Sequence, residues 1–169
     1  MIAYKFLRED GASPFTRFAW PLPGGAPGAW VEAPVVACRS GIHACRRADL
    51  PLWAGRVLYE AELAGEVTEE PTKVVAPRAR LVRRIGAWED GVRDAYTRMC
   101  ADRAHHLALG AAPPLLGWDT VIEPSVPQGP ALLGFVAARI GEQRWGVRGY
   151  HAERARQTAW LMEHLDLPH

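Results

Sequence analysis

The chain has 169 residues, and its 20 basic residues almost cancel its 19 acidic ones, which leaves a formal net charge of +1. A chain of this length buries enough surface for one domain without a disulfide framework or an obligatory metal. The balanced charge argues against a general nucleic-acid or anionic-membrane surface. No apolar run approaches the roughly 20 residues of a membrane span, and residues 1–8 are too short and too polar for a secretory signal. We therefore expect a cytoplasmic protein with neither nucleic acid nor membrane as a partner.

The strand patterns lie in the first half of the chain, and turn-rich segments separate them. We expect strands over residues 2–7, 30–36, 56–63 and 73–83, with a short helical turn over residues 48–53. Residues 38–45 form a predicted hairpin, with Ser40 and Gly41 as a two-residue turn. In that hairpin Cys38 faces His43, and Cys45 lies on the same side of the sheet as His43.

The second half of the chain has the apolar spacing of amphipathic helices. We expect helices over residues 88–109, 131–143 and 150–165, with a proline-rich connector before the second. Strands followed by helices predict an α+β fold, in which a mostly antiparallel sheet is packed by C-terminal helices. The expected organisation is a single domain over residues 1–169, with a strand-rich half over 1–85 and a helical half over 87–165.

Two thiols and an imidazole in the predicted hairpin allow three interpretations. Cys38, His43 and Cys45 are candidate zinc ligands, although their spacing matches no common zinc motif and a fourth ligand or a water is needed. Cys38 is also a candidate nucleophile activated by His43. The third interpretation is packing of buried thiols around a hydrogen-bonded histidine. Three cysteines, an odd number, indicate reduced thiols rather than disulfides.

Glu60 and Glu62 occupy alternate positions of a predicted strand, so their carboxylates share one face. Paired carboxylates suit acid–base catalysis. Arg78 and Arg80 alternate in the same way on the next predicted strand, and antiparallel pairing would set the four residues opposite one another as a charge ladder. Both interpretations stay open at this point.

Only Lys5 and Lys73 of the 20 basic residues are lysine. In a chain that otherwise uses arginine, these positions either require a compact ammonium or a titratable amine, or they are two surface lysines kept by chance.

The order of motifs resembles a family of uncharacterised bacterial and phage proteins that share a Cys-x-Ser-Gly-Phe-His-x-Cys core. Residues 38–45 carry that core here, with Ile42 at the usual aromatic position, and Lys73 matches a lysine that opens a later strand. The resemblance covers residues 1–85 and implies no particular activity.

A fainter similarity is to ADP-ribosyltransferase-like domains. Tyr4-Lys5 is similar to their early Tyr-Arg pair, residues 41–43 to their Gly-hydrophobic-aromatic strand, and residues 59–63 to their glutamate-bearing strand. The resemblance implies that Tyr4 and Lys5 contact a nucleotide and that Glu60 or Glu62 orients a ribose hydroxyl of NAD. Lysine replaces the family's arginine here, and no Ser-Thr-Ser segment is present.

The leading functional hypothesis is a small-molecule or nucleotide pocket at the N-terminal sheet of an ADP-ribosyltransferase-like enzyme. Its candidate catalytic residues are His43, Glu60 and Glu62, its substrate-binding residues are Tyr4, Lys5 and Lys73, and Cys38 and Cys45 adjoin them. One alternative is a non-catalytic regulatory module that docks a protein partner on its helical half. The other is a metal- or thiol-dependent enzyme at the hairpin. The cofactor stays open between NAD and zinc.

Overall fold

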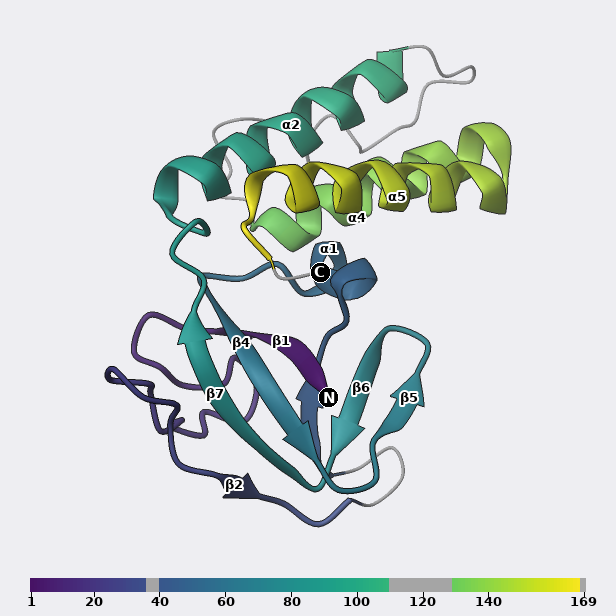
Figure 1. Ribbon diagram of the computed structural model, residues 1–169. Helices are drawn as coiled ribbons and strands as arrows, with labels where there is room; N and C mark the ends of the chain where they lie inside the picture. Colours follow the sequence, from purple (N-terminus) through teal and green to yellow (C-terminus); the bar gives the residue numbers. More distant parts are fainter. Residues whose placement is uncertain (36–39, 110–128, 168–169) are drawn as a thin grey trace.

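The computed structural model describes residues 1–35, 40–109 and 129–167. The protein has the expected α+β fold, with antiparallel sheets in the N-terminal half and helices in the C-terminal half (Figure 1). The strands are β1 (Ile2–Leu7), β2 (Val31–Glu32), β3 (Ile42–Ala44), β4 (Val57–Ala64), β5 (Thr68–Glu70), β6 (Lys73–Ala76) and β7 (Arg78–Arg84). The helices are the 3₁₀ turn η1 (Arg47–Asp49), α1 (Leu50–Trp53), α2 (Asp90–Leu109), α4 (Pro130–Trp145) and α5 (Val147–His164).

The strands form two sheets that meet at one point. One sheet has the order β1-β4-β7-β2 and the other the order β3-β6-β5, and all pairs are antiparallel. Tyr4 of β1 and Cys45, which directly follows β3, form an isolated bridge between the sheets. The bridge joins β1, an edge strand of the first sheet, to the residue after β3, an edge strand of the second.

Pro77 divides the segment that the sequence analysis treats as one strand. Residues 73–76 pair within the three-stranded sheet, whereas residues 78–84 pair within the four-stranded sheet. Proline has no N–H to donate to a strand ladder, so the chain changes sheets here. The Pro77 carbonyl still accepts a hydrogen bond from the Ala33 N–H at 2.9 Å. The prediction of a single strand over residues 73–83 is wrong for this reason.

The predicted hairpin over residues 38–45 falls partly outside the described residues, because residues 36–39 are not among them. In the described part, β3 pairs with β6, with Ile42 opposite Ala76 and Ala44 opposite Val74. Gly41 precedes β3 with a φ of +128°, a conformation that favours glycine. The described neighbours of β3 are thus β6 and, through Cys45, β1.

The four-stranded sheet is covered on both faces. Tyr4, Phe6 and Leu58 pack with the helices in one core, which includes Tyr96 and Leu161 from the second half of the chain. The alternate residues of β1 and β4 pack in a second core against residues of β3 and β6. Full burial of one such apolar side chain contributes roughly 1.5–3 kcal/mol. The first core joins the strand-rich half to the helices, whereas the second lies within the strand-rich half.

The helices α2, α4 and α5 form one layer, with α1 between that layer and the strands (Figure 1). Within the layer, α4 packs against both α2 and α5. Gly141 and Gly149 allow α4 and α5 to approach closely, because a Cβ on Gly149 would lie 2.1 Å from the Gly141 carbonyl oxygen. In the described parts of the chain, none of the helices has the length and apolar character to cross a membrane.

Candidate functional site

The two sheets separate immediately beyond the Tyr4–Cys45 bridge. Tyr4 and Cys45 exchange two backbone hydrogen bonds of 2.8 Å, and Cys45 also donates its thiol hydrogen to the Tyr4 carbonyl at 3.1 Å. At the next position of β1, the side chain of Lys5 reaches across, and its Nζ donates to the His43 carbonyl at 2.7 Å. The His43 carbonyl thus accepts a hydrogen bond from a lysine side chain, and not from a backbone N–H as in a continued strand ladder.

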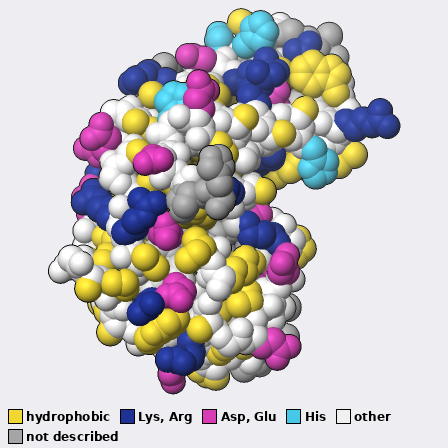
Figure 2. All heavy atoms as spheres, in the orientation of Figure 1, with side chains coloured by type: hydrophobic (Ala, Val, Ile, Leu, Met, Phe, Trp, Pro, Cys, Tyr) yellow, Lys and Arg dark blue, Asp and Glu magenta, His cyan; other side chains and the backbone are white. Residues whose placement is uncertain are grey.

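A pocket of about 340 Å³ lies at this separation. Its lining comes from both sheets, from α1, from the loop after β1 and from the start of α4, and comprises Tyr4, Lys5, Phe6, Pro14, Phe15, His43, Ala44, Cys45, Leu52, Trp53, Ala54, Gly55, Lys73 and Ala131. Consecutive strand residues point to opposite faces of a sheet. Because residues 4–6 all line the pocket, the pocket lies along the edge of β1. Figure 2 also shows an indentation between the helical layer and the strand-rich half.

The structure brings together five of the residues that the sequence analysis assigns to a pocket. Tyr4, Lys5, His43, Cys45 and Lys73 all line this cavity. Of the other three candidates, Cys38 lies outside the described residues, and Glu60 and Glu62 are not in the lining. Both lysines of the chain are therefore in the lining of one pocket.

Lys5 is partly withdrawn from solvent and lies against an aromatic ring. Its Nζ is 4.9 Å from the centroid of the Trp20 ring, a cation–π distance. Burial lowers the pKa of Lys5 from 10.5 to about 8, and the nearby Cys45 opposes this change. Its hydrogen-bond acceptor at His43 is a neutral carbonyl oxygen, so that contact leaves the positive charge uncancelled.

Lys73 and His43 extend the basic character of the pocket. Lys73 forms an ion pair with Glu70, with 3.2 Å between Nζ and Oε2. Burial lowers the pKa of His43, and the positive charges of Lys73 and Lys5 lower it further, against the opposing effect of Glu70. A lowered pKa keeps the imidazole of His43 neutral near pH 7. The pocket then presents two ammonium groups beside an uncharged imidazole.

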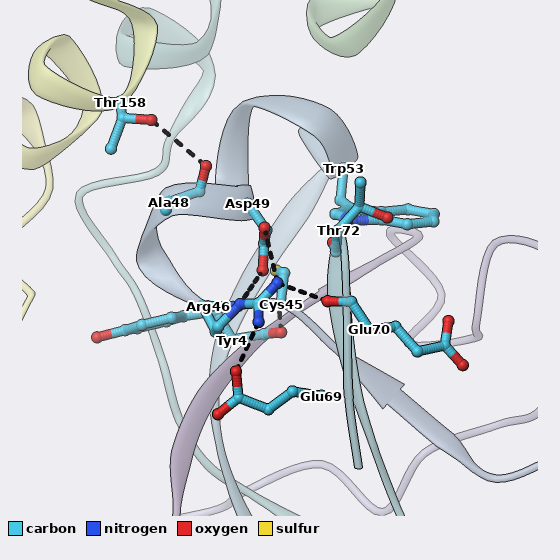
Figure 3. A network of polar contacts seen from close by, with 10 residues as sticks. All are labelled: Tyr4, Cys45, Arg46, Ala48, Asp49, Trp53, Glu69, Glu70, Thr72 and Thr158. Atoms are coloured by element: carbon cyan, nitrogen blue, oxygen red, sulfur yellow. Dashed lines mark hydrogen bonds and ion pairs between the residues drawn. The ribbon is translucent and has the colours of Figure 1, made fainter. Parts of the chain in front are cut away.

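Arg46, which follows Cys45 of the pocket lining, ties the end of β3 to β5 (Figure 3). Its guanidinium donates to Asp49 at 2.7 Å, to Glu69 at 2.9 Å and to the Glu70 carbonyl at 2.8 Å. Asp49 is buried, and it also accepts from the Arg46 backbone N–H at 3.1 Å. This network fixes the turn between β3 and α1, and with it the position of the residues on either side.

Trp53 and Phe15 supply an aromatic rim to the pocket. Their ring centroids are 6.4 Å apart in an edge-on arrangement. The Trp53 Nε1–H donates to the Thr72 carbonyl at 2.7 Å, which ties α1 to the start of β6 (Figure 3). Phe15 is 81% exposed. Only the fold brings residues 15, 53 and 73 into one pocket lining.

Cys45 has the environment of a packed thiol. It is 3% exposed, and burial raises its pKa to about 12, with the Asp49 carboxylate acting in the same direction. A protonated thiol is a poor metal ligand and a poor nucleophile. Cys100 is likewise buried in the helical core, and its pKa is also raised to about 12 by burial. Both described cysteines are free.

The predicted zinc site concerns Cys38, His43 and Cys45. Within residues 1–35, 40–109 and 129–167, no three histidine, cysteine, aspartate or glutamate side chains gather to hold a metal ion. Cys38 lies outside these ranges, so zinc at the complete set stays a prediction.

Glu60 and Glu62 are not among the residues that line the pocket, although Glu60 lies opposite Tyr4 in the β1–β4 ladder. Glu62 is opposite Arg80, and their side chains pair at 2.6 Å. A bulge in the β4–β7 ladder places Arg83, rather than its neighbour Val82, opposite Glu60, and this pair is 2.9 Å apart. The charge-ladder interpretation holds for Arg80. It is wrong for Arg78, which pairs with Glu32 instead.

The helical half exposes apolar side chains that bear on the alternative of a protein-docking module. Leu132 and Phe135 of α4 are 47% and 44% exposed, and Trp145 and Val147 are exposed at the junction with α5. The protein-partner alternative stays a prediction, and these residues are where it would act.

Comparison of the chain with family models, with curated proteins and with solved structures gave no match.

Proposed function

We propose that the protein binds a small anionic molecule with an aromatic or apolar part in the pocket where its two sheets separate. The observation that carries this proposal is the placement of Lys5 and Lys73, the only lysines of the chain, in the lining of one cavity. Ligand pockets characteristically combine apolar walls with a few convergent polar groups. Here Phe6, Phe15 and Trp53 supply the walls.

The charge of the pocket favours an anion. Lys5 donates to a neutral carbonyl, and Lys73 pairs with the carboxylate of Glu70. The charge of Lys5 is therefore available to a ligand. A bound phosphate or carboxylate offsets the cost of keeping two ammonium groups close to a neutral imidazole. Each charge-assisted hydrogen bond to such a group contributes roughly 1.5–3 kcal/mol.

The size of the pocket favours a ligand no larger than a mononucleotide. A volume of about 340 Å³ lies near the lower end of the roughly 300–1,000 Å³ that ligand pockets span. A dinucleotide such as NAD would place one half in the pocket and the other half outside it. The likeness of Tyr4-Lys5 to ADP-ribosyltransferase-like domains makes NAD the dinucleotide to test, with ADP-ribosyl transfer as its proposed chemistry.

The test is thermal unfolding and titration calorimetry with AMP, ADP and NAD, and with adenosine as the uncharged control. We expect the nucleotides to raise the unfolding temperature and adenosine to have little effect. Lys73→Met should weaken binding about tenfold or more, because one charge-assisted contact is lost. Glu32→Gln, which removes a charge outside the pocket lining, is the matched control and should leave the affinity unchanged.

Two results would contradict the proposal. One is that none of the anions stabilises the protein at millimolar concentration. The other is that Lys73→Met and Glu32→Gln affect binding equally, because the anion would then lie elsewhere. For the NAD proposal, hydrolysis or transfer that is lost in Glu60→Gln supports the catalytic assignment of that carboxylate, and unchanged turnover removes it.

A further inference from the structure

Lys5 is held at the pocket wall by two contacts to its amine. Its Nζ is anchored by one donated hydrogen bond to the His43 carbonyl and by the Trp20 ring. The same residue belongs to the pocket lining, between Tyr4 and Phe6. An amine that donates one N–H to a backbone carbonyl keeps its lone pair free for another direction. The amine is thus oriented before any ligand arrives.

The surroundings also make the unprotonated form of this amine accessible. Burial lowers the pKa of Lys5 to about 8, whereas an ordinary lysine has a pKa near 10.4. A lysine desolvated in an apolar pocket is one of the arrangements that turn this side chain into a nucleophile. Lys73, in the same lining, offers a second cation at which an anionic group can be held.

We infer that Lys5 is the nucleophile of an imine-forming site, and that Lys73 holds the anionic group of the carbonyl compound with which it reacts. This inference rests on the proposed function, because the compound is an anion bound in the same pocket. The Nζ lone pair adds to the carbonyl carbon, and the carbonyl oxygen takes up a proton. The resulting carbinolamine loses water while Nζ releases a proton to solvent. One amine and one carbonyl thereby give one imine and one water, with no redox step.

The experiment uses pyridoxal 5′-phosphate as the probe, since it combines an aldehyde, an aromatic ring and a phosphate. Incubation with low micromolar probe is followed by borohydride reduction, which fixes any imine, and by peptide mapping. The chain has only three amines to compare, those of Lys5, Lys73 and the N-terminus. We expect labelling of Lys5 to exceed that of Lys73 by about tenfold or more near pH 7.5.

Two comparisons isolate the roles of the lysines. Lys73→Met should reduce labelling by pyridoxal 5′-phosphate but leave labelling by pyridoxal, which lacks the phosphate, nearly unchanged. Lys5→Arg keeps the positive charge without a reactive amine, so it should abolish the adduct. Retained stabilisation of Lys5→Arg by AMP shows that this variant is folded and still binds.

Equal labelling of the three amines, or preferential labelling of Lys73, would overturn the inference. If AMP stabilises the wild-type protein while Lys5 stays unlabelled, the imine site fails and the proposed anion pocket stands. If Lys5 is labelled equally by pyridoxal and its phosphate, and no anion stabilises the protein, the anion pocket fails together with the role given to Lys73.

Discussion

The pocket and the β4–β7 ladder both concentrate charge on the sheets, but they balance it differently. In the ladder each glutamate faces an arginine, with Glu60 paired to Arg83 and Glu62 to Arg80. In the pocket Lys73 is paired with Glu70, whereas the ammonium group of Lys5 donates to a neutral carbonyl. Burial and both lysines lower the pKa of His43. Charges that pair within the fold stabilise the fold. A charge at a cavity that lacks an opposite charge can instead pair with a ligand.

The largest expected difference between the two regions is the pH dependence contributed by Lys5. Below pH 8 the folded and unfolded chains both carry this charge, so the full cost of burying it is present. Between pH 8 and 10.5 the unfolded chain holds a proton that the folded chain has lost, so the free energy of unfolding rises with pH. We expect a rise of about 2 to 3 kcal/mol from this group.

The measurement is urea denaturation of the wild type and of Lys5→Met at intervals from pH 7 to 10.5. The stability advantage of Lys5→Met should shrink as the pH increases, because methionine does not titrate. Parallel pH curves for the two proteins would show that Lys5 has an ordinary pKa.

Substitutions in the β4–β7 ladder should have effects of intermediate size, and these effects should be on the stability of the protein. Glu60→Gln should lower the free energy of unfolding by about 1 to 2 kcal/mol, since the Glu60 side chain is only 10% exposed. Glu62→Gln should cost less than about 1 kcal/mol, because both members of its pair are about one-third exposed. Equal losses, measured by urea denaturation, would contradict the burial difference between the pairs.

A smaller effect is expected for the thiol at the pocket. The raised pKa of Cys45 predicts no measurable reaction with a thiol reagent at pH 8 in the folded protein, and rapid reaction in urea. Peptide mapping identifies which cysteine is modified. Modification of Cys45 in the folded protein at the rate of an exposed thiol would restore the hypothesis of a reactive hairpin cysteine.

The smallest effect on stability is expected at the pocket rim. Phe15→Ala should change the free energy of unfolding by no more than about 0.5 kcal/mol, because the side chain is 81% exposed. The same change should weaken binding of an aromatic anion severalfold if the ring covers the ligand. Calorimetry with AMP measures this, and an unchanged affinity would remove Phe15 from the site.

Much of the fold was predictable because its signals are local. The helical spacing of residues 88–109 and the alternation of Glu60 and Glu62 depend on neighbours within a few positions. The strand over residues 73–83 was mispredicted because Pro77 moves the chain from one sheet to the other. Apolar alternation reports which face of a strand is buried, but it does not report which strand lies beside it.

The candidate site, like the fold, could be predicted only in part from the sequence. The sequence by itself determined which residues are chemically unusual, above all the two lysines in a chain rich in arginine. Only the tertiary structure decided that Lys5 and Lys73 line one cavity with Phe15, Trp53 and Ala131. It also paired Glu60 and Glu62 with arginines outside that cavity. The physical reason is that residue chemistry is set by each side chain alone, whereas a pocket exists only where strand pairing ends and distant segments meet.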